Sequence, residues 1–428
     1  MLSKLKTNIV WSGLFLLSYC NYAHKLFSRK FLYTFVIVII FSGAAHAETE
    51  KNYNQSTIQD FQLHGFIALG LIDVDGSDFV NDEEGLSPDL TELGLNTSYQ
   101  LTDTVRLAGQ VVYLNGGNRY AKGFRVDYAL LDWAAYTDES WQANIYLGRF
   151  KNNHWLYSSS RVVPFARPSI ILPQSVYFDG FRDIAVGSDG AYIKVSHSND
   201  KLGNFDFSLS YGKSPISDKQ TEILLGDSAF GKTIQDYELH GSVYWQPTFS
   251  QWRFGLSLLN SDFHYNQNQD FDVFYNAEFD FQFYTMNAMY EGEYWEFSGE
   301  IYQQRFVTDG FYVPGFHKDS TGQGFYGQTR YKVTPNLTLL AKYEYFYLDK
   351  NDKDGKKLQE TTGVPYYFGF NNDVTLGLAY GVSSNMEVRA EHHWVEGGGR
   401  LTPVVVPDPQ KNSSEKWTMW AIQFMYWF

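Results

Sequence analysis

Short runs in which apolar and polar side chains alternate recur along the chain from Phe61 onward. In the run ELGLNTSYQL, one face carries Leu93, Leu95, Thr97, Tyr99 and Leu101. The opposite face of that run is polar or glycine, and NFDFSLSYG and NDVTLGLAYG repeat the design further along the chain. A period of two is that of a β-strand with one wet face and one apolar face. The chain therefore predicts many amphipathic strands.

No stretch after residue 47 contains the roughly 18–20 consecutive apolar residues that a transmembrane helix needs. The strongest apolar run, Phe31 to Phe41, follows Arg29 and Lys30 and leads into Ala45-His46-Ala47. A basic, then apolar, then A-x-A order is the signature of a cleavable secretory signal. We therefore expect a leader over 1–47 that is cleaved after Ala47. A polar periplasmic tail over 48–59 and a barrel over 60–428 would follow.

The charge and cysteine content exclude several classes of function. The 428 residues carry a formal charge of −14, and the leader holds five basic residues and no acidic one. An acidic mature chain argues against a nucleic-acid partner. The only cysteine, Cys20, lies in the leader. The mature chain thus predicts no disulfide framework, no thiolate metal site and no cofactor.

Short and long connections alternate between the predicted strands. Short turns are expected near 102–103, 137–140, 199–203, 247–248, 291–293, 334–335 and 383–385. Long polar loops are expected near 73–90, 115–125, 150–187, 213–236, 261–278, 306–323, 349–371 and 396–415. Seven turns and eight loops join sixteen strands, and this alternation is typical of outer-membrane barrels, with turns in the periplasm and loops outside. The predicted fold class is an all-β, transmembrane antiparallel β-barrel of about sixteen strands.

The parity of charged residues within the strands predicts which side chains line a pore. A sheet in lipid must close on itself, and a charge facing mid-bilayer costs about 2–4 kcal/mol. The charges that fall in the polar phase are therefore assigned to the channel wall: Arg106, Arg253, Arg330, Arg389, Glu296, Glu300, Glu344, Glu387 and Glu391. Charged side chains around a channel wall select ions by the sign of their charge. The alternative is that these side chains only pair with one another. Arg149 shares the phase of Leu147 and is expected at a strand end, turned toward the following loop.

The run KWTMWAIQFMYWF alternates up to its last residue, Phe428. Apolar residues at every second position before a terminal aromatic look like the motif by which outer-membrane barrels are recognised for insertion. We assign that role to Phe424, Tyr426 and Phe428.

The pattern and the two ends of the chain resemble the general Gram-negative porin family. That resemblance implies sixteen strands, a homotrimer, and a third long loop folded into the lumen to narrow it. The third long connection, Phe150 to Gly187, is the longest, and it follows YLGRF, similar to the Gly-Arg that ends this strand in many porins. The resemblance also implies a location in the outer membrane of a Gram-negative bacterium, among outer-membrane lipids and lipopolysaccharide.

The constriction loop departs from the acidic loop of familiar porins. Its charged residues are Lys151, Arg161, Arg167, Asp179, Arg182 and Asp183. Its aromatic residues are Trp155, Tyr157, Phe165, Tyr177, Phe178 and Phe181. These rings either stack against sugars in the pore or hold the loop against the wall, and the second interpretation is favoured.

Catalytic and metal-binding motifs are weak. Ser158, Ser159 and Ser160 have His154 nearby but no nucleophile elbow or supporting acid. Asp73 to Glu84 resembles a calcium loop with Asp78 where glycine is required, and fits equally well a looser role in bridging lipopolysaccharide through divalent ions. We therefore expect no enzyme and no metal site. The predicted function is a diffusion channel for ions and small hydrophilic solutes, with a substrate-specific channel or an adhesin or structural anchor as alternatives.

Overall fold

The computed structural model describes residues 61–82, 85–182, 187–268, 272–403, 405–410 and 412–428. The predicted leader and tail lie outside these residues. Sixteen strands occur in the described part of the chain: β1 (Phe61–Asp75), β2 (Thr91–Thr102), β3 (Val105–Asn115), β4 (Gly123–Thr137), β5 (Trp141–Lys151), β6 (Gly187–Asn199), β7 (Gly203–Lys213), β8 (Lys232–Gln246), β9 (Trp252–Asn266), β10 (Ala277–Glu291), β11 (Trp295–Gly310), β12 (His317–Lys332), β13 (Leu337–Tyr347), β14 (Phe370–Ser383), β15 (Met386–Glu396) and β16 (Lys416–Trp427).

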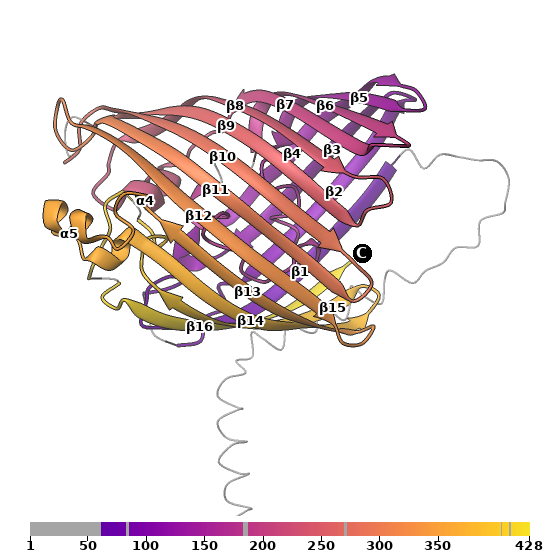
Figure 1. Cartoon of the computed structure of the whole chain (residues 1–428). Helices are drawn as coiled ribbons and strands as arrows, with labels where there is room; N and C mark the ends of the chain where they lie inside the picture. The colour runs from indigo at the N-terminus through magenta and orange to yellow at the C-terminus, as the bar shows by residue number, and fades with distance from the viewer. Residues whose placement is uncertain (1–60, 83–84, 183–186, 269–271, 404, 411) are drawn as a thin grey trace, which may run out of the picture. The chain divides into compact units, whose positions relative to one another are not determined.

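Every strand pairs antiparallel with its neighbours in sequence, and β1 closes the sheet by pairing with β16 (Figure 1). Closure leaves no sheet edge, so each strand finds hydrogen-bond partners on both sides. The predicted fold class, an antiparallel barrel of sixteen strands, is confirmed. No helix among the described residues is long and apolar enough to cross a membrane.

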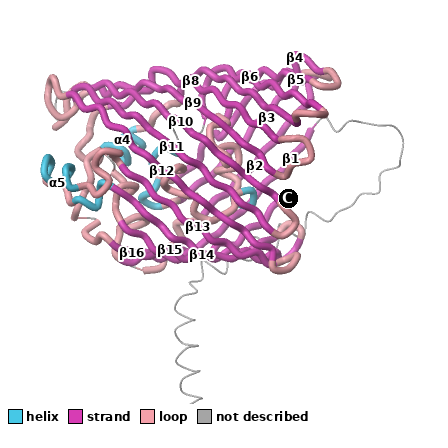
Figure 2. The backbone as a smooth tube through the Cα atoms, viewed as in Figure 1, coloured by secondary structure: helices cyan, strands magenta, loops and turns pink. Residues whose placement is uncertain are grey.

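Long and short connections alternate as the sequence predicts. The short turns gather at one end of the barrel and the long loops at the other, where helices α4 (Asp218–Leu225) and α5 (Lys356–Thr362) also lie (Figure 2). Among the described residues of the long connections there are four 3-10 turns: η1 (Gly117–Arg119), η2 (Pro164–Ala166), η3 (Asp179–Phe181) and η4 (Tyr366–Gly369). We call the two ends the turn end and the loop end.

The two faces of the strands differ as the alternation requires. On β2, Leu95 and Tyr99 point outward and are exposed, whereas Glu92 points inward and is buried. On β16, Ile422 is exposed while its neighbours Ala421 and Gln423 are buried. Outward apolar side chains meet hydrocarbon in a membrane barrel, so their exposure in the isolated chain is expected.

Two predicted loops are much shorter in the structure. Strand β9 ends at Asn266 and β10 begins at Ala277, and only 311–316 separates β11 from β12. The predicted loops over 261–278 and 306–323 were therefore too long. Near the loop end the outward residues of these strands are polar, as in the Arg305–Asp319 ion pair of 2.7 Å, although backbone pairing continues. The outward residues are no longer apolar there, so the alternation of apolar outward and polar inward residues stops before the strands end.

Arg149 lies near the end of β5, as the sequence predicts, but its side chain turns toward the neighbouring strand rather than the loop. The sequence predicted that it turns toward the following loop, but its Nη1 lies 3.3 Å from Oδ1 of Asp189 on the adjacent strand β6. Both residues share the phase of outward side chains such as Leu147 and Ile193. A neighbouring carboxylate thus compensates an outward charge near the loop end.

Candidate functional site

The connection between β5 and β6 contacts strands on widely separated parts of the wall. We call its described residues, 152–182, the inner loop. Asn152 contacts Glu238 of β8, and Arg167 contacts Glu92 of β2. In a closed barrel, a segment that reaches strands so far apart around the circumference lies across the interior. The inner loop therefore divides the space inside the barrel.

Three wall carboxylates on alternate strands hold the backbone of the inner loop. Glu300 of β11 accepts the N–H of Leu156 at 3.2 Å, and Glu344 of β13 accepts that of Ser175 at 2.6 Å. Glu391 of β15 accepts the N–H groups of Ile170 and Ile171 at 2.5 and 3.2 Å. These hydrogen bonds tie the backbone of the inner loop to β11, β13 and β15.

The sequence assigned Glu300, Glu344 and Glu391 to the channel wall. The structure places all three inside the barrel but beneath the inner loop, where each is at most 5% exposed. Their side chains face protein rather than water. Residue parity distinguishes the inside of a barrel from the outside, but it carries no information on what fills the inside.

The arginines of the inner loop are buried in ion pairs. Asp179 lies within 3.2–3.6 Å of Arg119, Arg161 and Arg182, while Arg167 pairs with Glu92. Burial disfavours the ionised Asp179 carboxylate, but the three guanidinium groups outweigh burial and lower its pKa. These basic residues therefore anchor the inner loop. Asp183, also assigned to it from the sequence, lies outside the described residues.

The aromatic residues of the inner loop pack against the wall. Trp155, Tyr177, Phe178 and Phe181 are buried in one cluster with aromatic side chains of β9 to β12. Phe165 stacks on Trp427 with ring centroids 4.7 Å apart. The four rings of the cluster have no free face for a solute, so their contacts favour the packing role over sugar stacking. Tyr157 and Phe165 are only partly buried and line a cavity of about 160 Å³.

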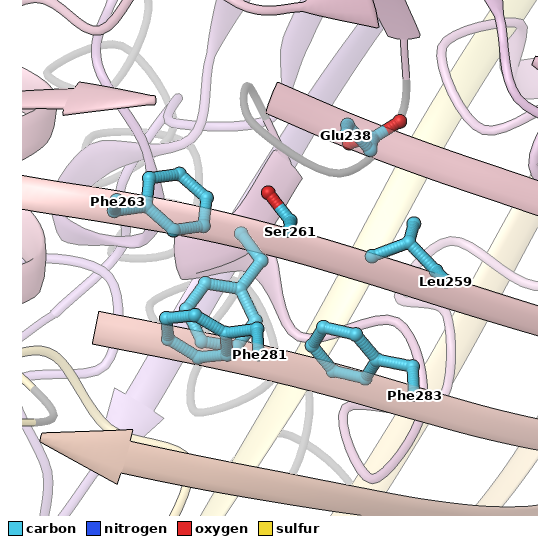
Figure 3. Close-up of a pocket in the computed structure, with 7 residues that line it drawn as sticks. Glu238, Leu259, Ser261, Phe263, Phe281 and Phe283 are labelled. Carbon is cyan, nitrogen blue, oxygen red and sulfur yellow. The ribbon is translucent and has the colours of Figure 1, made fainter. Parts of the chain in front are cut away.

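A small void beside Phe181 shows how tightly this side of the interior is filled. Phe263, Phe281 and Phe283 surround it together with Glu238 (Figure 3). Its volume is about 10 Å³, room for no more than one water molecule. This void is therefore too small to admit a solute.

The turn half of the interior is open and lined by charges of both signs. Cavities of about 380, 160 and 350 Å³ lie along its wall. Six residues that the sequence assigned to the channel line these cavities: Arg106, Arg253, Arg330, Arg389, Glu296 and Glu387. Arg106 pairs with Asp132, and Arg330 pairs with Glu296. Arg389 lines the second cavity but is buried, and it donates to the backbone carbonyls of Pro164 and Arg167.

Lys151 bridges the wall and the inner loop at the edge of the 380 Å³ cavity. Its Nζ pairs with Asp127 and lies 3.0 Å from the carbonyl oxygen of Ser159. Gln110 donates to the same Asp127 carboxylate at 2.8 Å. The sequence assigned Lys151 to the constriction but missed Asp127, which is the extra residue of a bulge in β4, where strand parity fails.

The residues assigned to an insertion signal lie on β16 and just beyond it. Phe424 and Tyr426 share the outward phase with Ile422, and Phe428 is exposed. Phe428 exchanges two backbone hydrogen bonds with Gly65 of β1, at 3.0 and 3.1 Å. A Cβ at Gly65 would lie 2.5 Å from the Phe428 ring. Gly65 thus leaves room for this ring at the closing seam.

Comparisons with known proteins identify the fold. No protein-family profile and no curated protein sequence matches the chain. OmpT of Vibrio cholerae aligns over 88% of this chain and 100% of its own, at 14% identity and a TM-score of 0.54. An anion-selective porin from Comamonas acidovorans aligns over 86% of this chain and 99% of its own, at 14% identity and a TM-score of 0.54. The outer membrane channel DcaP of Acinetobacter baumannii aligns over 86% of this chain and 97% of its own, at 12% identity and a TM-score of 0.53.

The chain therefore has the fold of the sixteen-stranded outer-membrane porins of Gram-negative bacteria. The location predicted from the sequence, the bacterial outer membrane, is the one named for OmpT and DcaP.

Among the residues that the structure describes, no group of three or more histidines, cysteines or carboxylates could hold a metal ion. The calcium-like segment Asp73 to Glu84 is described only in part, since Glu84 lies outside the described residues. Asp73 accepts a hydrogen bond from the indole of Trp420 at 3.1 Å.

Proposed function

We propose that this chain is an outer-membrane porin, a water-filled channel through which ions and small hydrophilic solutes diffuse passively, and that it catalyses no reaction. The observation that carries the proposal is a closed barrel with an apolar outer face and an open, charge-lined turn half. Polar walls around water allow hydrated solutes to pass, whereas the apolar outer face requires lipid.

The path of solutes would follow β3 to β7. Contacts of the inner loop with β8, β11, β13 and β15 occupy the opposite wall. Along β3 to β6 the interior contains the 380 Å³ cavity, and the Lys151–Asp127 bridge marks its boundary toward the inner loop. We therefore place the narrow part of the channel at this bridge.

The charges along the open wall favour weak ion selectivity. Positive and negative side chains alternate there in pairs, as in Lys194 and Arg253 with Asp206. A wall that presents both signs at similar density favours neither cations nor anions strongly.

Single-channel recording tests the proposal. Purified chain in a planar bilayer under a salt gradient should show stepwise conductance and a reversal potential near zero. A membrane that stays silent at all protein concentrations would overturn the proposal and favour an adhesin or structural anchor. We further propose a homotrimer surrounded by outer-membrane lipids and lipopolysaccharide. One similar structure, an OmpT, is described as a trimer form, and chemical crosslinking in detergent would detect such an assembly here.

A further inference from the structure

The 380 Å³ cavity has an aromatic wall that the inner loop leaves uncovered. Tyr128 of β4, Tyr146 and Phe150 of β5, and Tyr192 of β6 line it. Tyr146 and Tyr192 are direct cross-strand neighbours with ring centroids 5.3 Å apart, and Phe150 lies 5.5 Å from Tyr192. We call this space the tyrosine cavity. Tyr128 and Tyr146 are partly exposed, whereas Phe150 and Tyr192 are buried.

Polar side chains complete the lining of the tyrosine cavity. Gln62, His64, Asn96 and Ser98 come from β1 and β2, and Arg106 comes from β3. The Arg106 side chain is 48% exposed, and its Nη2 donates to Asp132 at 2.7 Å. No other hydrogen bond of this guanidinium is formed with the described residues. Its remaining N–H groups are therefore available to a ligand.

The charges of the tyrosine cavity are already compensated. Arg106 pairs with Asp132, and Lys151 pairs with Asp127. An ionic ligand would compete with these pairs, while a purely apolar ligand would leave the amides and the arginine without partners. The ligand that fits is neutral, with flat apolar faces and a rim of hydroxyl groups.

We propose that the tyrosine cavity is a binding site for a neutral sugar ring. The C–H face of the sugar stacks on the partly exposed ring of Tyr146, and its hydroxyls bond to Arg106 and the amides of β1 and β2. A volume of about 380 Å³ lies within the range of about 300–1,000 Å³ typical of small-molecule sites. The site lies on the channel wall, so this inference rests on the proposed channel function and names a solute class for it.

Ion-current recording with glucose tests the inference, with a polyethylene glycol of matched mass as the control solute. Glucose should interrupt the current of the wild-type channel in a saturable way, and the glycol should not. Tyr146→Leu should weaken the apparent glucose affinity about tenfold or more, because it removes the aromatic face. Tyr146→Phe keeps that face and should stay within about threefold of wild type.

Tyr343→Leu serves as the matched control. Tyr343 is an exposed tyrosine on the outward face of β13, so this variant should conduct and bind glucose as the wild type does. If Tyr146→Leu fails to fold, Tyr128→Leu replaces it, and the comparison of glucose with glycol on the wild type needs no variant.

The outcomes separate the two proposals. A silent wild-type membrane overturns the channel function itself. A conducting channel that glucose does not interrupt, or that glucose and glycol affect equally, overturns only the sugar site. Interruption by benzoate but not by glucose would likewise overturn it, because it would show a site for an aromatic anion.

Discussion

Arg167 of the inner loop and Glu92 of β2 form a two-pronged ion pair: Nη1 lies 3.1 Å from Oε1 and Nη2 lies 2.7 Å from Oε2. Both side chains are 4% exposed, and they are 75 residues apart in sequence. Two parallel hydrogen bonds fix orientation as well as distance. The first residues of the inner loop contact β8 and β11, and this ion pair joins the loop to β2 on the opposite side of the barrel.

Replacing Glu92 should loosen the inner loop. The Glu92 carboxylate lies 2.7 Å from Arg167 and 3.6 Å from Arg182, and Glu92→Gln removes its charge while both arginines stay buried. Breaking a buried ion pair in this way costs about 3–5 kcal/mol. We expect a lower thermal unfolding temperature in detergent and a larger, noisier conductance. Lys219→Gln, which removes an exposed ion pair on α4, is the control and should match the wild type. Wild-type conductance and stability in Glu92→Gln would contradict the anchoring role.

Arg106 and Arg389 should differ in their effect on ion selectivity. Arg106 is half-exposed in the open cavity, so Arg106→Gln should shift the reversal potential toward cation selectivity. Arg389 is 3% exposed and donates to carbonyls of the inner loop. Arg389→Gln should therefore mainly lower stability and shift the reversal potential less. Unchanged reversal potentials in both variants would refute the assignment of these arginines to the channel wall.

Lys151 should control the width of the channel. Lys151→Ala removes the bridge from Asp127 to the Ser159 carbonyl, and we expect a higher single-channel conductance with larger solutes admitted in liposome swelling. Lys416→Ala removes an exposed lysine near the loop end and should leave conductance unchanged. A conductance of Lys151→Ala equal to that of the wild type would place the narrow point elsewhere.

The contribution of Asp179 should depend on pH in one direction. Burial raises the pKa of this carboxyl, but Arg119, Arg161 and Arg182 lower the pKa by a larger amount, so the net shift is downward. A carboxyl whose pKa is lower in the folded than in the unfolded protein stabilises the folded state. This contribution is complete at pH values above the pKa in the unfolded state, about 4, and it is lost as the pH falls through the pKa in the folded state. The difference in unfolding free energy between wild type and Asp179→Asn should stay constant from about pH 7 to 5 and shrink in stronger acid. A difference that already shrinks between pH 7 and 5 would contradict the ion-pair cluster.

The closing seam should be sensitive to any side chain at Gly65. Gly65→Val brings carbon atoms against the Phe428 ring and the Gly94 carbonyl, and we expect a destabilisation of about 1–3 kcal/mol. The double variant Gly65→Val/Phe428→Ala should recover part of it. Gly109→Ala is the control, because a Cβ there has 3.6 Å to its nearest atom. No recovery in the double variant would show that the ring is not the cause.

The strand pattern could be predicted because lipid and water act on every second residue of a membrane strand. Leu95 and Glu92 occupy opposite faces of β2, as their phases in the sequence require. The prediction failed where that solvent contrast ends. At the loop end of β9 to β12, outward residues such as Arg305 and Asp319 are polar, so strands were mistaken for loops.

The sequence by itself determined the closed barrel, its sixteen strands and the inward placement of most wall charges, because these follow from a local period of two and from the lengths of connections. Only the tertiary structure decided which inward residues meet water. Glu300 and Glu391 lie beneath the inner loop, whereas Arg106 and Tyr146 line an open cavity, although all four have the same inward phase. The difference arises from where a long connection folds back across the interior, and that path depends on contacts between residues far apart in the chain.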